Sequence, residues 1–108
     1  MRSDASTPEG QFWDRAIQLA ERGRGAVSPN PVVGCVIVRE GKILARAGNR
    51  TLTDCDPTAH AELLAIRQAA AASGSERLTD CDLYVTLEPC AMCAAAMSFA
   101  RIRRLYYG

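Results

Sequence analysis

Apolar residues recur every three or four positions in three stretches of the chain, which predicts three helices. We expect the first helix to begin at Thr7, because threonine, proline and glutamate follow one another there in the order of an N-cap and a first helical turn. Gly23 and Gly25 are expected to end it. Its buried stripe consists of Trp13, Ala16, Ile17 and Ala20.

The second and third helices are predicted in the latter half of the chain. Asp56 and Pro57 are expected to begin the second helix, which ends at residues 73–74. The alanine-rich run 90–100 forms the third helix, after a glutamate and a proline. The apolar face of the second helix consists of Ala59, Leu63, Ile66 and Ala70.

Runs of β-branched and aromatic residues between these helices predict the strands. Residues 32–38 predict a buried strand, which a tight turn at residues 40–41 connects to an antiparallel partner at 43–48. Residues 83–87 and 105–107 predict two more strands. This order of elements predicts a three-layer α/β domain with a mixed sheet, helices on both faces, and later strands that run parallel across a helical crossover.

Composition places the chain among ordinary globular proteins, and its 108 residues are expected to form one domain, residues 1–108. The net charge is only +1, so no overall basic field indicates nucleic-acid binding. The most basic cluster, Arg101, Arg103 and Arg104, suits a solvated helix end as well as a phosphate contact. No apolar stretch approaches the ~20 residues of a membrane span and no signal segment is found, which predicts a cytoplasmic protein.

The five cysteines are an odd number, which fits reduced thiols or a metal site better than a disulfide framework. Two of them, Cys90 and Cys93, lie one turn apart at the start of a predicted helix and can point at one ion. Of the others, Cys35 is expected in the core, and Cys55 and Cys81 are expected in loops.

His60, the single histidine of the chain, lies near the start of another predicted helix. Together with Cys90 and Cys93 it supplies one nitrogen and two sulfur ligands. Three protein ligands leave the fourth position of zinc open, as in catalytic rather than structural sites. Glu62, two residues after His60, is placed to move protons between water, ring nitrogen and leaving amine. Either motif alone would be a weak signal, because such residues are often structural.

The two motifs together, H-x-E and P-C-x-x-C, resemble the signature of the cytidine and deoxycytidylate deaminase-like family. Residues 56–62 (DPTAHAE) and 83–94 (LYVTLEPCAMCA) are more narrowly similar to the bacterial tRNA-specific adenosine deaminases. That resemblance implies zinc as cofactor, a tRNA anticodon loop as substrate, conversion of the wobble adenosine to inosine, and a homodimer. It also implies that Asn49 contacts the base.

A second resemblance leaves the substrate open. Residues 29–35 (PNPVVGC) are similar to the pyrimidine deaminases of riboflavin biosynthesis, in which the asparagine that matches Asn30 belongs to the substrate pocket. Those enzymes separate the two metal cysteines by a longer insert, whereas two residues separate Cys90 from Cys93. The nearer resemblance is therefore to the tRNA enzymes. The alternatives are a pyrimidine or other small-nucleobase deaminase and an inactive zinc-binding module.

Members of the family continue beyond the strand at residues 104–108 with another strand and a C-terminal helix. This chain stops before them. We expect its last strand to leave an open sheet edge that favours self-association. A version extended by the two elements is expected to be more soluble and more active.

Overall fold

The computed structural model describes residues 8–22 and 33–108. These residues form three helices and one four-stranded sheet in the strand order β2-β1-β3-β4. The elements are α1 Pro8–Arg22, β1 Gly34–Arg39, β2 Lys42–Gly48, α2 Ala61–Ser73, β3 Cys81–Val85, α3 Ala91–Ala100 and β4 Arg104–Tyr107. The predicted end of the first helix at Gly23 and Gly25, and the segment 28–31, lie outside the described residues.

The sheet is mixed, as predicted. β1 runs antiparallel to both β2 and β3, while β3 and β4 run parallel and are connected by α3. The hairpin turn between β1 and β2 places Glu40 at φ 53° and Gly41 at φ 75°. Two successive left-handed residues match the twist of the strands in a two-residue hairpin. β4 forms one edge of the sheet, and its Leu105 and Tyr107 are exposed.

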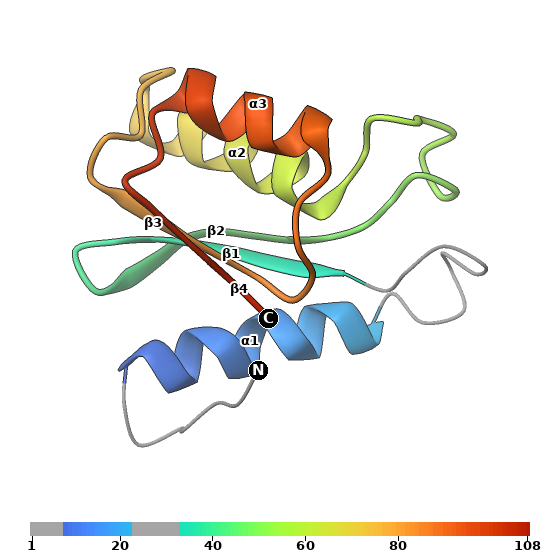
Figure 1. Cartoon of the computed structure of the whole chain (residues 1–108), viewed down its shortest axis with the longest axis horizontal. Helices are drawn as coiled ribbons and strands as arrows, with labels where there is room; N and C mark the ends of the chain where they lie inside the picture. The colour runs from blue at the N-terminus through green and yellow to red at the C-terminus, as the bar shows by residue number, and fades with distance from the viewer. Residues whose placement is uncertain (1–7, 23–32) are drawn as a thin grey trace.

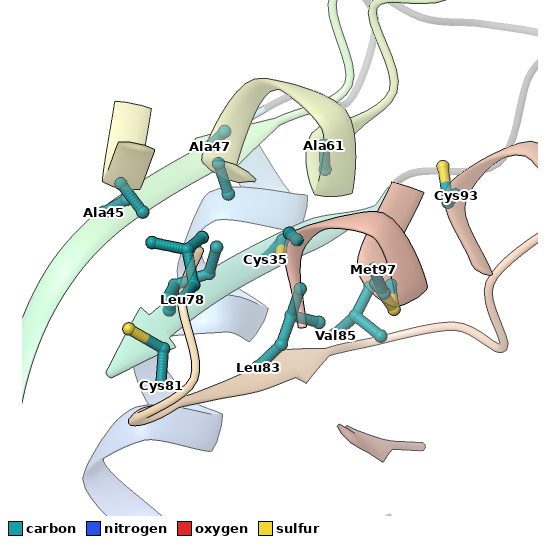
Figure 2. Close-up of a cluster of buried hydrophobic side chains, with 14 of the residues drawn as sticks. Cys35, Ala45, Ala47, Ala61, Leu78, Cys81, Leu83, Val85, Cys93 and Met97 are labelled. Atoms are coloured by element: carbon teal, nitrogen blue, oxygen red, sulfur yellow. The ribbon is translucent and has the colours of Figure 1, made fainter. Parts of the chain in front are cut away.

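The helices lie on both faces of the sheet, with α1 on one face and α2 and α3 on the other (Figure 1). β1 is buried on both sides, and its side chains alternate between the two cores. Cys35 points into the core under α2 and α3 (Figure 2), and Ile37 belongs to the same core. Val36 and Val38 pack instead with the Phe12 side chain of α1. The fold-class prediction is confirmed.

The start of α2 corrects the prediction. The helix begins at Ala61, five residues after Asp56, because the Asp56 carboxylate accepts hydrogen bonds from the backbone N–H and hydroxyl of Thr58. These bonds lower the pKa of Asp56 and hold residues 56–58 in a turn instead of a helix. His60 consequently becomes the N-cap, with extended backbone angles of φ −72° and ψ 151°.

The buried face of α2 also differs from the prediction. The fully buried side chains are small, which lets the helix approach the sheet closely, and the larger Leu63 and Ile66 are only partly buried beside α3. On α1, Phe12 is buried with Ala16 and Ala20, whereas the predicted Trp13 and Ile17 are partly exposed. The buried residues of α2 are Ala61, Glu62, Ala65 and Ala69.

Cys81 and the start of β3 also differ from the prediction. The residue was expected in a loop, but it opens β3, pairs with Arg39 and is fully buried. β3 therefore lies two residues earlier in the chain than the predicted strand at 83–87. Cys35 in the core and Cys55 in an exposed loop are confirmed. Within residues 8–22 and 33–108, no helix is both long and apolar enough to cross a bilayer.

Gly34, at the start of β1, lies against the backbone of α1 with no room for a side chain. A Cβ atom added there would lie 1.8 Å from the Ala16 carbonyl oxygen and 2.7 Å from the Ala20 nitrogen, so α1 would have to move. We expect Gly34→Ala to lower the free energy of unfolding by about 3 kcal/mol or more. The control is Gly41→Ala, where a Cβ meets nothing within 4 Å and the cost, about 1 kcal/mol, comes from the left-handed φ. Urea unfolding that ranks the two variants in the opposite order would contradict this packing.

Candidate metal centre

Three side chains from two helix N-termini meet at one point. His60 is the N-cap of α2, Cys90 is the N-cap of α3, and Cys93 lies in the first turn of α3. Their candidate ligand atoms all lie within 4.8 Å of one another. The His60 Nδ1 atom is 3.6 Å from Cys90 Sγ and 3.5 Å from Cys93 Sγ.

These distances fit a tetrahedral zinc ion. Zinc–nitrogen bonds of about 2.0–2.1 Å and zinc–sulfur bonds of about 2.3 Å place the two ligand atoms about 3.6 Å apart. Both distances from His60 agree with that value. One imidazole and two thiols are also ligand types that zinc prefers, and they leave a fourth position for water or substrate.

The N-cap positions leave these side chains available. An N-cap side chain usually bonds to an N–H of the first helical turn, but neither His60 nor Cys90 makes such a bond. Their carbonyl oxygens still accept the first helical hydrogen bonds, from Leu64 and Ala94 at 3.0 and 2.9 Å. The helices are therefore started by the backbone, while the side chains turn toward each other.

Two anchors fix the segments that lead into these helices. Thr86, before α3, donates its backbone N–H to the Gly34 oxygen, and its hydroxyl oxygen accepts a hydrogen bond from the Gly34 N–H, both at 3.1 Å. Before α2, the Arg50 N–H donates to the Ala59 oxygen at 2.9 Å. The positions of both N-caps are thus tied to β1 and to the loop after β2.

Cys93 lies at the border between this cluster and the core under α3 (Figure 2). Burial raises the pKa of its thiol well above the ordinary value, and the Glu62 carboxylate raises that pKa further. A coordinated divalent cation reverses this preference, because it deprotonates a ligating thiol. The buried thiol is therefore chemically suited to a metal partner.

Glu62 is the one charged side chain among the buried residues that the structure describes, with 5% of its surface exposed. It lies in the first turn of α2, where the helix dipole favours a negative charge. Its carboxylate is close enough to Cys93 to raise the pKa of that thiol, but it does not belong to the three-residue cluster. Glu62 therefore lies beside the cluster without being one of its members.

A cleft of about 630 Å³ opens over the cluster. Asn49, the predicted base-contacting residue, lines it together with His60, Glu62 and Cys90, so the structure brings most of the predicted site residues together. Asn30, the other predicted substrate residue, lies outside the described residues. Further lining residues, which the sequence did not predict as site residues, are Val33, Thr51, Leu52, Cys55, Asp56, Pro57, Leu87 and Glu88.

The walls of the cleft are apolar and acidic. Among the described residues that line it, the carboxylates are Asp56, Glu62 and Glu88, and there is no lysine or arginine. The arginines of the basic cluster lie beyond the other end of α3, about 15 Å along the helix from Cys90. Arg103 is engaged there in a bidentate pair with Asp82, with both nitrogen–oxygen distances 3.0 Å.

Comparison with known proteins identifies the family. The model of the cytidine and deoxycytidylate deaminase zinc-binding region matches residues 6–108. The chain belongs to this deaminase family. The family and the zinc cofactor that the sequence motifs predicted are both confirmed by this match.

Relatives within the deaminase family include purine-directed enzymes. The chain is 64% identical over 76 residues to a tRNA-specific adenosine deaminase of Agrobacterium fabrum, a match that covers 70% of this chain and 50% of that protein. It is 45% identical to a guanine deaminase of Bacillus subtilis, over 89% of this chain and 61% of the relative. The chain thus spans between about half and three-fifths of the length of these two curated relatives.

The fold matches solved deaminase structures as well. A structure from a study of A-to-I editing by tRNA:A34 deaminases at the wobble position of transfer RNA superimposes with a TM-score of 0.88 and 51% identity. The match covers 94% of this chain and 77% of the other.

Thiol reactivity tests the environments of the cysteines. Burial and the adjacent Asp80 raise the pKa of the Cys81 thiol to about 11, so iodoacetamide at about pH 8 should leave it unmodified and label it faster as the pH rises toward that value. Exposed Cys55 should already be labelled readily at about pH 8. Cys90 should be labelled in chelator and protected by added zinc. Peptide mass mapping measures each site, and rapid labelling of Cys81 at about pH 8 would contradict its burial.

Proposed function

We propose that residues 1–108 form a zinc-dependent deaminase domain that converts adenosine to inosine, with the wobble position of a tRNA anticodon as its target. His60, Cys90 and Cys93 bind the zinc ion, and Glu62 transfers protons. The observation that carries the proposal is that one cleft is lined by two members of the cluster and by a buried carboxyl group outside it.

The reaction replaces the exocyclic amino group of the base by oxygen from water and releases ammonia. When bound, zinc lowers the pKa of a coordinated water to about 7. Glu62 takes the proton of the attacking water and delivers protons to the ring nitrogen and to the departing amine. Its position in the first turn of α2 suits this task, because the carboxyl group lies beside the ligands without being one of them.

The substrate part of the proposal rests on the relatives and on the cleft. Similarity to tRNA-specific adenosine deaminases covers 70% of this chain at 64% identity in one relative and 91% at 42% identity in another. A deaminase must receive its base unstacked, and an anticodon loop presents such a base at little energetic cost. The acidic lining of the described cleft favours a base whose phosphates remain outside, and disfavours a free nucleotide whose phosphate enters with it.

A second candidate is deamination of free guanine, which the similarity to the Bacillus subtilis enzyme supports. An uncharged purine also suits the acidic lining. A pyrimidine of riboflavin biosynthesis is a third candidate, supported by the likeness of residues 29–35. The two-residue separation of Cys90 and Cys93 argues against it.

The proposal includes a homodimer in the cytoplasm. Exposed apolar side chains on the outer surface of α3 and along the edge strand β4 support association between chains. Phe99 is 82% exposed and Tyr107 is 52% exposed. Burial of such groups is the main favourable term in most associations between proteins.

Two substitutions separate the metal ligands from the proton-transfer group. Cys90→Ala should lower bound zinc well below one ion per chain and destabilise the fold, because zinc binding is coupled to folding. Glu62→Gln should keep zinc and the fold but lower turnover by about 10²- to 10⁴-fold. The matched control is Glu76→Gln, at an exposed position away from the cleft. Full zinc content in Cys90→Ala, or near-normal turnover in Glu62→Gln, would refute the assigned roles.

A substrate panel tests the specificity. We expect inosine to form in an anticodon stem-loop, with binding that weakens as salt concentration rises because phosphate contacts release counterions. Guanine and the riboflavin-pathway pyrimidine are assayed beside it at the same enzyme and salt concentrations, with ammonia as a common readout. Robust turnover of either small molecule without inosine in the RNA would replace the proposed substrate.

A further inference from the structure

Thr51 follows Asn49 by two residues in the loop from β2 to α2, and both side chains line the cleft. The Asn49 Oδ1 atom accepts two hydrogen bonds from Thr51, one from its backbone N–H and one from its hydroxyl group, each at 3.0 Å. An amide oxygen has two lone pairs, so both acceptor positions of Asn49 are occupied.

The backbone N–H of Thr51 fixes which way the Asn49 amide faces. A flipped amide would oppose this N–H to the NH₂ group of Asn49, which places donor against donor. Within residues 8–22 and 33–108, nothing accepts a hydrogen bond from the Asn49 Nδ2 atom. The amide therefore offers the cleft two donors and no acceptor.

The loop itself is held in place on both sides of this pair. The Asn49 N–H donates to the Val33 oxygen at 3.3 Å, and the Thr51 oxygen accepts from the Asp56 N–H at 3.1 Å. Arg50, between them, donates its backbone N–H to the oxygen of Ala59, just before α2. The donors of Asn49 are thus placed relative to the same helix that carries His60 and Glu62.

We infer that Thr51 is a positioning residue that makes Asn49 a donor-only contact for the substrate. The inference rests on the proposed function of the cleft. A base is accepted when it presents an unprotonated ring nitrogen or a carbonyl oxygen to Asn49. A base that presents an amino group there meets two donors, and neither group is satisfied.

Kinetics of matched variants test this role. Thr51→Val keeps the shape but removes the hydroxyl group, and we expect KM to rise about fivefold with kcat unchanged, as for the loss of one neutral hydrogen bond. Thr51→Ser should restore KM to within about twofold. Thr53→Val is the control, because Thr53 is exposed in the same loop and does not line the cleft. Asn49→Asp keeps the acceptor but removes the donors, and should lower kcat/KM on the order of 10²-fold.

NMR of the Asn49 side chain needs no enzymatic turnover, so it tests the role of Thr51 independently of the proposed activity. The side-chain NH₂ signal of Asn49, assigned by its loss in Asn49→Asp, should have a clearly lower ¹⁵N order parameter in Thr51→Val than in wild type or Thr51→Ser. Equal order in Thr51→Val would overturn the inference, and so would reduced order with no change in KM. If wild type deaminates no base of the panel, the proposed function fails, but the NMR comparison still decides whether Thr51 fixes Asn49.

Discussion

An imidazole and two thiols from separate helices can bind one ion only if the first turns of α2 and α3 converge to within a few ångströms. The N-caps His60 and Cys90 meet this constraint, with 3.6 Å between their ligand atoms. Convergence depends on the sheet, because Gly34 in β1 holds the segment before α3 through Thr86. Small residues on α2 let that helix lie close to the same strand.

The same convergence creates the cleft and its chemistry. Because His60 caps α2, Glu62 falls in the first turn of that helix, where it is buried beside the cluster. The loop that precedes α2 forms another wall of the cleft and carries Asn49 and Thr51. The proposed ligands, proton-transfer group and substrate contacts therefore all follow from where two helices begin.

The sequence predicts those parts of the site that depend on spacing within one segment of the chain. Cys90 and Cys93 lie one turn apart at a helix start, and His60 and Glu62 are near neighbours, so each pair could be placed from the chain alone. That the two pairs meet across 30 positions was inferred from the ligand count, one nitrogen and two sulfurs, and from the resemblance to a family, since spacing within one helix says nothing about distance between helices.

Other features needed the structure because they depend on competition between local signals or on packing. Asp56 and Pro57 resemble a helix start, but the hydrogen bonds of Asp56 to Thr58 delay α2 to Ala61. Cys81 follows a polar turn, yet its pairing with β1 draws it into the core. The bonds from Thr51 to Asn49 span only two residues, but their effect on the cleft appears only when the loop is seen against α2.

X-ray absorption at the zinc edge tests the central claim most directly, because it reports the ligands of the ion without reference to activity. The account predicts a first shell of two sulfur atoms at about 2.3 Å and two lighter atoms at about 2.0–2.1 Å, one of them from an imidazole. Substitution of His60 by alanine should remove the imidazole signal. A shell of four sulfur atoms, or one without sulfur, would contradict the account.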